Sequence, residues 1–244
     1  MRTYISREYI TELQAIHLLR ALKKYFTLSK LSAITRIDET IISKYINGHI
    51  IPHYGKAKSI ITALLSHPDV NNYLNNIIDA YLRANINRYP DILPLINSNV
   101  DLIIYLTLRL IEKLINIKIT RLITVEGGGL FIASIISSYL SVNLSYCIRD
   151  KYIPDSYVEY IHKENPFYSS FLSLVTANLS SKDYVLIVDD VIVTGETIKT
   201  VYRLIRRTNA KIIGAAVLFV SNTEIVKTLS DELNMDIIYE FSLF

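Results

Sequence analysis

The second half of the chain alternates between short apolar runs that are typical of strands and longer segments with helical periodicity. The strand-like runs are 121–125, 144–148, 184–190, 212–220 and 236–241, and the helical segments include 130–140 and 197–207. Strands that lack polar alternation and are separated by helices indicate a parallel sheet covered on both faces. We therefore expect an α/β domain in this half of the chain.

Two adjacent carboxylates interrupt this pattern where the apolar strand at 185–188 is expected to end. Asp189 and Asp190 are followed by a short polar turn and then by a helix, and the turn consists of Val193, Thr194, Gly195, Glu196 and Thr197. Free N–H groups at a helix start suit a phosphate, and paired carboxylates suit sugar hydroxyls or Mg²⁺. The alternative is a strand that merely ends in polar capping residues. The pattern favours a ligand that contains both phosphate and sugar, bound beyond the carboxyl ends of the strands.

These residues resemble the signature of the type I phosphoribosyltransferases, which is an apolar strand, Asp-Asp, an apolar pair and Thr-Gly-Gly-Thr. The resemblance extends over about residues 91–244. It implies a parallel-sheet domain in which residues 193–197 hold the 5′-phosphate of phosphoribosyl pyrophosphate (PRPP). It also implies that Asp189 and Asp190 contact the ribose and help to hold Mg²⁺.

Three further segments match the same family. RLITVEGGGLFIAS corresponds to the pyrophosphate-loop segment, with Glu126, Gly127, Gly128 and Gly129 as the loop. SYCIRDKYIP makes Arg149 and Lys151 candidates for pyrophosphate contact, and PDSYVEYIHKENPFY corresponds to the mobile loop of the enzymes, with His162 and Lys163 as candidates or as plain solvent-facing residues. Two departures stand out: Glu196 occupies the place of the second glycine, and Asp150 interrupts the basic pair.

The N-terminal segment differs in both charge and periodicity. Residues 1–65 hold ten Lys or Arg against four Asp or Glu, a net charge of +6, whereas the rest of the chain is net acidic. Apolar residues recur at steps of three and four from Tyr9 to Phe26, which predicts a helix, and two short helices with a turn at 35–37 follow. Asp38 is the expected N-cap of the second. The basic excess is either a solvated face or a surface that contacts a polyanion.

This segment resembles the helix-turn-helix domains of bacterial and phage repressors. The resemblance depends on Ala33 between the helices, Ile37 in the turn, Ile42 facing inward and the close DETIISKYINGHIIP. It implies that Glu39, Thr40, Ser43 and Lys44 face DNA bases and that Lys30, Arg36, Lys56 and Lys58 contact phosphates. A generic helical bundle is the alternative.

The predicted organisation is a helix-turn-helix domain at 1–66, a helical connector at 67–90 and a phosphoribosyltransferase-like domain at 91–244, which begins with a helix at 100–115. No uninterrupted apolar run of membrane-spanning length and no secretory signal are present, and the single cysteine, Cys147, cannot form an internal disulfide. We expect a cytoplasmic protein without a membrane partner.

Two functions compete at this point, and a third is possible. The favoured prediction is a homodimeric transcription regulator that binds double-stranded DNA and senses PRPP or a nucleotide, resembling the purine repressors of Gram-positive bacteria and comparable archaeal proteins. The alternative is an active orotate or purine phosphoribosyltransferase with an accessory helical segment. The third is a nucleic-acid-binding module whose phosphate cradle is vestigial.

Overall fold

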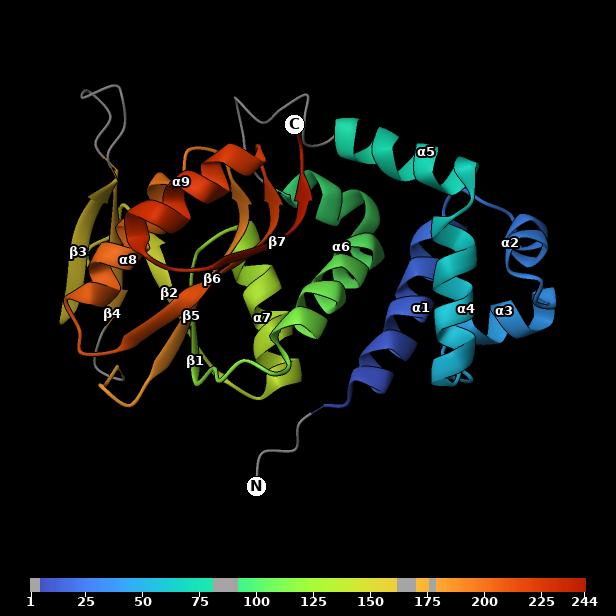
Figure 1. Ribbon diagram of the computed structural model, residues 1–244, viewed down its shortest axis with the longest axis horizontal. Helices are drawn as coiled ribbons and strands as arrows, with labels where there is room; N and C mark the ends of the chain where they lie inside the picture. The colour runs from blue at the N-terminus through green and yellow to red at the C-terminus, as the bar shows by residue number, and fades with distance from the viewer. Residues whose placement is uncertain (1–4, 81–91, 162–169, 176–178) are drawn as a thin grey trace. The chain divides into compact units, whose positions relative to one another are not determined.

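The computed structural model describes residues 5–80, 92–161, 170–175 and 179–244 and divides the chain into two compact units (Figure 1). Unit 1 comprises residues 1–85 and Leu93–Ile115, and unit 2 comprises Ile86–Ile92 and Asn116–Phe244. The units differ from the predicted division at residue 91, because the helix after that point groups with the N-terminal helices.

Unit 1 is helical. Its helices are α1 (Arg7–Lys23), α2 (Leu28–Thr35), α3 (Glu39–Ile46), α4 (Tyr54–Leu65), α5 (Pro68–Ile78) and α6 (Leu93–Leu114). The side chain of Asp38 accepts a hydrogen bond from the amide of Thr40 at 2.8 Å, so the predicted N-cap of α3 is confirmed. Arg36 ends α2 in the left-handed conformation, with φ of 55°, and this sharp turn redirects the chain into α3.

The core of unit 1 forms between α1 and its neighbours α4 and α6. The predicted apolar face of α1 is partly correct: Ile16, Leu19 and Leu22 are buried, whereas Tyr9 is 41% exposed. Ile37 and Ile42 are buried as predicted, but Ala33 is exposed and does not separate two closely packed helices.

A kink at Asn99 interrupts α6. Its backbone is non-helical there, and the Asn99 side chain donates to the carbonyl of Ala21 at 3.2 Å while its oxygen accepts from the amide of Leu102 at 3.3 Å. The helix predicted from residue 100 therefore begins where this buried asparagine restarts the helix. By length and composition α6 could span a membrane, but it carries Asp101, Arg109, Glu112 and Lys113 and packs on α1, as the core helix of a globular unit does.

Unit 2 contains a seven-stranded sheet of order β3-β4-β2-β1-β5-β6-β7. Its strands are β1 (Arg121–Val125), β2 (Asn143–Arg149), β3 (Ser156–Ile161), β4 (Ser170–Val175), β5 (Tyr184–Ile192), β6 (Lys211–Val220) and β7 (Ile237–Ser242). The five strands from β2 to β7 in this order are parallel, and β3 and β4 form an antiparallel pair that adds to β2. The predicted α/β fold with a mostly parallel sheet is confirmed.

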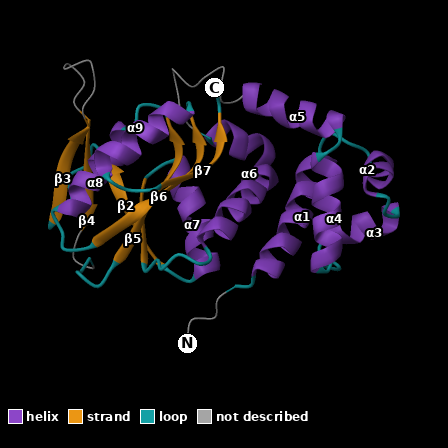
Figure 2. Cartoon of the chain, viewed as in Figure 1, coloured by secondary structure: helices purple, strands orange, loops and turns teal. Residues whose placement is uncertain are grey.

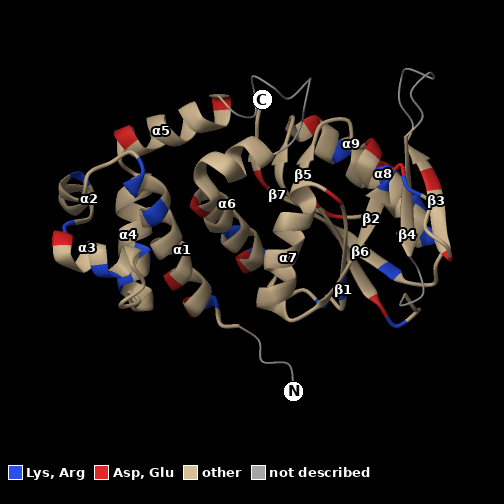
Figure 3. Ribbon diagram, turned by 180° about the vertical axis from the view of Figure 1, so that it is seen from behind, with Lys and Arg blue, Asp and Glu red and all other residues tan. Residues whose placement is uncertain are grey.

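Helices cover both faces of this sheet, as the opposite views of Figures 1 and 3 and the cartoon of Figure 2 show. The helices are α7 (Gly128–Leu140), α8 (Glu196–Arg206) and α9 (Thr223–Leu233). Apolar side chains of α8 and α9, such as Val201 and Leu229, join a single core with Ile187 of β5 and Val217 of β6. Helix α7 packs on β1, β2 and β5 from the other face.

Three elements of unit 2 differ from the sequence prediction. Strand β3 lies inside the segment that matches a mobile loop, and β4 and α9 are elements that the sequence pattern did not predict. Strand β3 is half-buried from residue 156 to residue 159, exposed at Tyr160 and buried at Ile161, and it lies at the edge of the described sheet beside β4, so its sequence lacks the apolar run of a central strand.

Cys147 is fully buried in β2, and this burial raises the pKa of its thiol to about 12. Because the thiolate is the reactive form, we expect no labelling by a thiol-specific disulfide reagent in native buffer at pH 8 and one thiol per chain after denaturation. Native labelling as fast as that of a free thiol would contradict the packing of β2.

Candidate active site

The predicted site residues meet at the carboxyl ends of three adjacent parallel strands. Strands β2, β1 and β5 are neighbours, and β1 pairs with both of the others. The loop after β1 and the start of α7 hold residues 126–129, the segment after β2 holds Lys151, and the turn after β5 and the start of α8 hold residues 193–197. One edge of the sheet therefore carries each predicted PRPP-contacting segment within the described residues, as the rule for open α/β sheets requires.

Asp189 and Asp190 lie within β5, as the strand-like run at 184–190 predicts, but the strand extends beyond the end that was expected at these acids. The strand continues to Ile192 because β6 still pairs with it there, whereas the pairing with β1 ends at Ile187. Both carboxylates are buried, and Asp189 Oδ1 accepts from the amide of Asp190 at 3.0 Å. Asp190 Oδ2 accepts from the amide of Ile92 at 3.2 Å, so this acid is held from outside the strand.

The glycines of the first loop pack directly on these two acids. A Cβ on Gly129 would lie 2.8 Å from both Asp189 Oδ1 and Thr124 Oγ1, and a Cβ on Gly128 would collide with Asp190 Oδ2. Gly127 precedes α7 with φ of 115°, a conformation that favours glycine. Gly128 and Gly129 thus allow the backbone at the start of α7 to lie against the carboxylate pair.

The turn after β5 presents free backbone donors. Gly195 has φ of 79°, and a Cβ there would lie 2.5 Å from Leu229, so glycine is required on two counts. Within the described part of the chain, the amides of Gly195 and Thr197 donate to no other group, and the amide of Glu196 makes only a 3.4 Å bond to Thr194 Oγ1. The first turn of α8 therefore retains the donors that an anion needs.

The carboxylate of Glu196, which lies beside this anion site, has a cationic partner. Its carboxylate lies 3.2 Å from the ammonium group of Lys199, one turn further along α8. Lys199 in turn pairs with Glu232 of α9 at 2.8 Å. The acid that replaces the family's second glycine is thus paired with a cation of its own helix.

The last residue of β2 and the segment after it place two cations near the same edge. Arg149 is half-buried and its amide donates to Glu126 Oε1 at 2.7 Å, while Lys151 is exposed. Asp150, which separates them, adopts φ of 53° and accepts bonds from the hydroxyl of Ser170 and the amide of Phe171. Because this carboxylate is directed to β4, the interruption of the basic pair has a structural reason.

The donor set fits Mg²⁺ only if the substrate completes it. Among the described residues no group of three His, Cys, Asp or Glu side chains could form an all-protein metal site. Two neighbouring carboxylates beside a phosphate-binding turn are a usual setting for Mg²⁺. This ion is commonly held by one or two acids together with substrate phosphates.

The β3–β4 pair is fastened to α8 by two arginines that sequence reasoning did not single out. Arg203 Nε lies 3.2 Å from Glu159 Oε1, and Arg207 donates to the carbonyl of Val158 at 2.8 Å. The guanidinium of Arg207 also stacks 4.4 Å from the centre of the Tyr157 ring. His162 and Lys163, the predicted mobile-loop candidates, lie outside the described residues.

The predicted DNA-contacting residues of unit 1 differ in their exposure and in whether they already contact another side chain. Glu39, Thr40 and Lys44 are exposed and Ser43 is half-buried. Lys30 forms an ion pair with Asp69 at 2.7 Å, and Lys58 lies over the ring of Tyr54. Arg36 is exposed and Lys56 half-buried. In the ribbon of Figure 3, stretches of α3 and α5 are coloured for Asp or Glu among others coloured for Lys or Arg, so this part of unit 1 is not uniformly positive.

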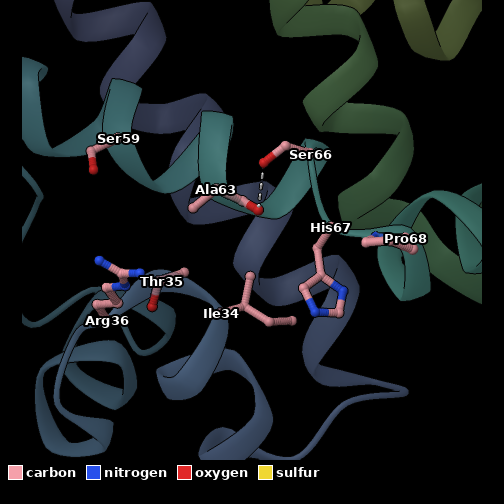
Figure 4. A pocket seen from close by; sticks show the side chains of 8 residues that line it. All are labelled: Ile34, Thr35, Arg36, Ser59, Ala63, Ser66, His67 and Pro68. Carbon is pink, nitrogen blue, oxygen red and sulfur yellow. Dashed lines mark hydrogen bonds between the residues drawn. The ribbon is translucent and has the colours of Figure 1, made fainter.

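A cavity of about 370 Å³ lies beside the α2–α3 turn in unit 1 (Figure 4). Its lining is mostly small or apolar, with one guanidinium and one imidazole, and consists of Ile34, Thr35, Arg36, Ser59, Ala63, Ser66, His67 and Pro68. The hydroxyl of Ser66 already donates to two backbone carbonyls of α4, that of Thr62 at 2.8 Å and that of Ala63 at 3.3 Å. Its lining contains no acidic side chain, unlike the edge of the sheet in unit 2 where the paired acids lie.

Comparison with known proteins identifies the C-terminal part of the chain. The family described as "Phosphoribosyl transferase domain" matches residues 96–242. The adenine phosphoribosyltransferase of Pseudomonas entomophila is 30% identical over 130 residues, which cover 53% of this chain and 70% of that protein. The xanthine phosphoribosyltransferase of Heliobacterium modesticaldum is 28% identical over 111 residues, which cover 45% of this chain and 59% of that protein.

Solved structures agree on the fold. The crystal structure of adenine phosphoribosyltransferase from Rhodothermus marinus superposes with a TM-score of 0.54 at 21% identity, covering 64% of this chain and 86% of that one. The Giardia lamblia enzyme complexed with 9-deazaadenine gives a TM-score of 0.53 at 17% identity, covering 61% and 83%.

These relatives overturn the favoured prediction of a transcription regulator. The proteins that match are adenine and xanthine phosphoribosyltransferases, which are enzymes, and none of these comparisons supports a DNA-binding role for the helices of unit 1. The prediction gave too much weight to the basic excess of residues 1–65. The homodimer, the duplex DNA partner and the cytoplasmic location stay predictions. The family match spans more than half of the sequence and includes the twin acids and both glycine-bearing turns, so the chain belongs to the phosphoribosyltransferase family.

Proposed function

We propose that this chain is an enzyme that transfers the ribose 5-phosphate of PRPP to a purine base and releases pyrophosphate. The observation that carries the proposal is the contact between the glycines of the β1–α7 loop and the twin carboxylates of β5, beside the free amides that begin α8. The adenine and xanthine enzymes among the relatives support a purine over orotate as the acceptor.

The reaction breaks the bond between ribose C1 and the pyrophosphate oxygen and forms a bond between C1 and a ring nitrogen of the base, which loses its proton. In this proposal the amides of Gly195 and Thr197 hold the 5′-phosphate, and Asp189 and Asp190 hold the ribose hydroxyls. The backbone at 127–129 lies against the leaving group, and Arg149 and Lys151 supply positive charge to it. Mg²⁺, when bound, would neutralise charge on the phosphate oxygens, with Asp189 and Asp190 as the protein's contribution to its ligands.

A turnover assay tests the proposal directly. Purified protein with PRPP and Mg²⁺ is offered adenine, xanthine, hypoxanthine, guanine, orotate or uracil in separate reactions, and both pyrophosphate and nucleotide are measured. We expect equal amounts of nucleotide and pyrophosphate with at least one purine and none with the pyrimidines. Binding of PRPP without turnover of any base would refute the enzyme and leave a ligand-binding domain.

A further inference from the structure

The acid in the phosphate turn creates a problem that the structure answers with a single lysine. Glu196 stands at the first position of α8, where the helix dipole stabilises an acidic side chain. The same dipole and the same amides are what a 5′-phosphate would use. A free Glu196 carboxylate would therefore both compete with the phosphate for those donors and repel it.

Lys199 lies where it can prevent this competition. Side chains on a helix lean toward its N-terminus, so a lysine three residues later can reach back to the first turn. The ammonium group lies 3.2 Å from Glu196 Oε1, and the Lys199 side chain is only 19% exposed. Glu232 of α9 holds the same ammonium at 2.8 Å, which fixes it from a second helix.

The charge state of Lys199 suits this role. The hydrogen bond with Glu232 raises the pKa of the Lys199 ammonium, and the bond with Glu196 adds to the effect against partial burial. The lysine therefore stays protonated throughout the neutral range. The Lys199 ammonium therefore places a positive charge beside the carboxylate of Glu196 in the first turn of α8.

We propose that Lys199 is a positioning residue that draws the carboxylate of Glu196 away from the phosphate-binding amides and so permits PRPP to bind. This inference rests on the proposed function and deepens it. It assigns to a residue outside the phosphate turn a role in the affinity for the phosphorylated substrate, while the chemistry at ribose C1 is left to other groups.

The test is a cycle of variants measured by steady-state kinetics and by calorimetric PRPP binding. We expect Lys199→Ala to raise the KM for PRPP about fivefold, as the loss of a well-held ion pair predicts, with kcat little changed. The double variant Glu196→Gly with Lys199→Ala should return the KM to the wild-type value, because the competing carboxylate is gone. Lys199→Arg should also retain the wild-type KM.

Lys227→Ala, which removes an exposed cation of α9, is the matched control and should leave KM unchanged. A purely structural role for Lys199 predicts instead that the double variant stays as impaired as Lys199→Ala and that both lose thermal stability together. That result, or an unchanged KM in Lys199→Ala, would overturn the inference while wild-type turnover still upholds the proposed function. Wild-type protein with neither PRPP binding nor turnover would overturn both.

Discussion

Replacing both Asp189 and Asp190 by asparagine should lower kcat/KM for PRPP by on the order of 10³-fold, which corresponds to about 4 kcal/mol of transition-state stabilisation. The change removes two buried negative charges from the segment where ribose hydroxyls and Mg²⁺ are proposed to bind, yet it keeps the shape of both side chains. The side-chain oxygen of the Asp190→Asn variant can still accept the hydrogen bond that Asp190 receives from Ile92, so the strand should remain in place. Initial rates at several PRPP and Mg²⁺ concentrations measure the effect.

The matched control is Asp231→Asn, an acid on the exposed side of α9. It removes a negative charge from the same unit and should leave the rates unchanged. Circular dichroism of each variant shows whether the fold is retained. A well-folded double variant with wild-type turnover would mean that the twin acids have no part in the reaction.

The second large effect is expected from Gly128→Ala. The added methyl group would lie 2.8 Å from Ile92 Cγ1 and would also meet the carboxylate of Asp190, so one of these groups must move. Overpacking of a buried contact costs about 1–3 kcal/mol of the free energy of unfolding. A displacement of Asp190 by about 1 Å can lower the rate about 100-fold. Denaturant unfolding and turnover, measured on the same preparation, separate the two effects.

Gly55→Ala is the control for the substitution itself. Gly55 lies in the first turn of α4, where a Cβ would make only ordinary contacts with His53 at 3.6 Å. Alanine favours helix over glycine, so this variant should be as stable as the wild type or slightly more stable. If Gly128→Ala behaved like Gly55→Ala in both measurements, the close packing of the loop on the acids would be wrong.

The site was predictable because its chemistry is local in sequence. Asp189, Asp190 and the turn at 193–197 follow one another within nine residues, so one short stretch defines both the acids and the phosphate donors. The reason for the glycines at 128 and 129 was not predictable, since the acids that exclude a Cβ there lie about 60 residues away in sequence. The pairing of Glu196 with Lys199 was within reach, because an i,i+3 spacing of opposite charges is visible in any helix.

The five parallel strands were also predictable, whereas the antiparallel pair β3 and β4 was not. Strand β1 was predicted at its observed bounds from the short run RLITV. All five of its residues are buried. Strand β3 is an edge strand whose sequence mixes polar and apolar residues, and β4 is a short strand that pairs with β3 and β2 but carries two serines among its six residues, so neither gives a continuous apolar run. The role of unit 1 was misjudged for a different reason: charge imbalance describes a surface and does not identify what binds to it.

The continuation of β5 beyond the acids has one more consequence. A strand rises about 3.3 Å per residue, so the two residues from Asp190 to Ile192 advance the chain by about 7 Å along a line that pairing with β6 keeps straight. The paired end of β5 therefore fixes the distance between the carboxylates and the phosphate turn. Under the proposed function, the ribose and the 5′-phosphate of PRPP would bind at two points whose separation this paired stretch of β5 sets.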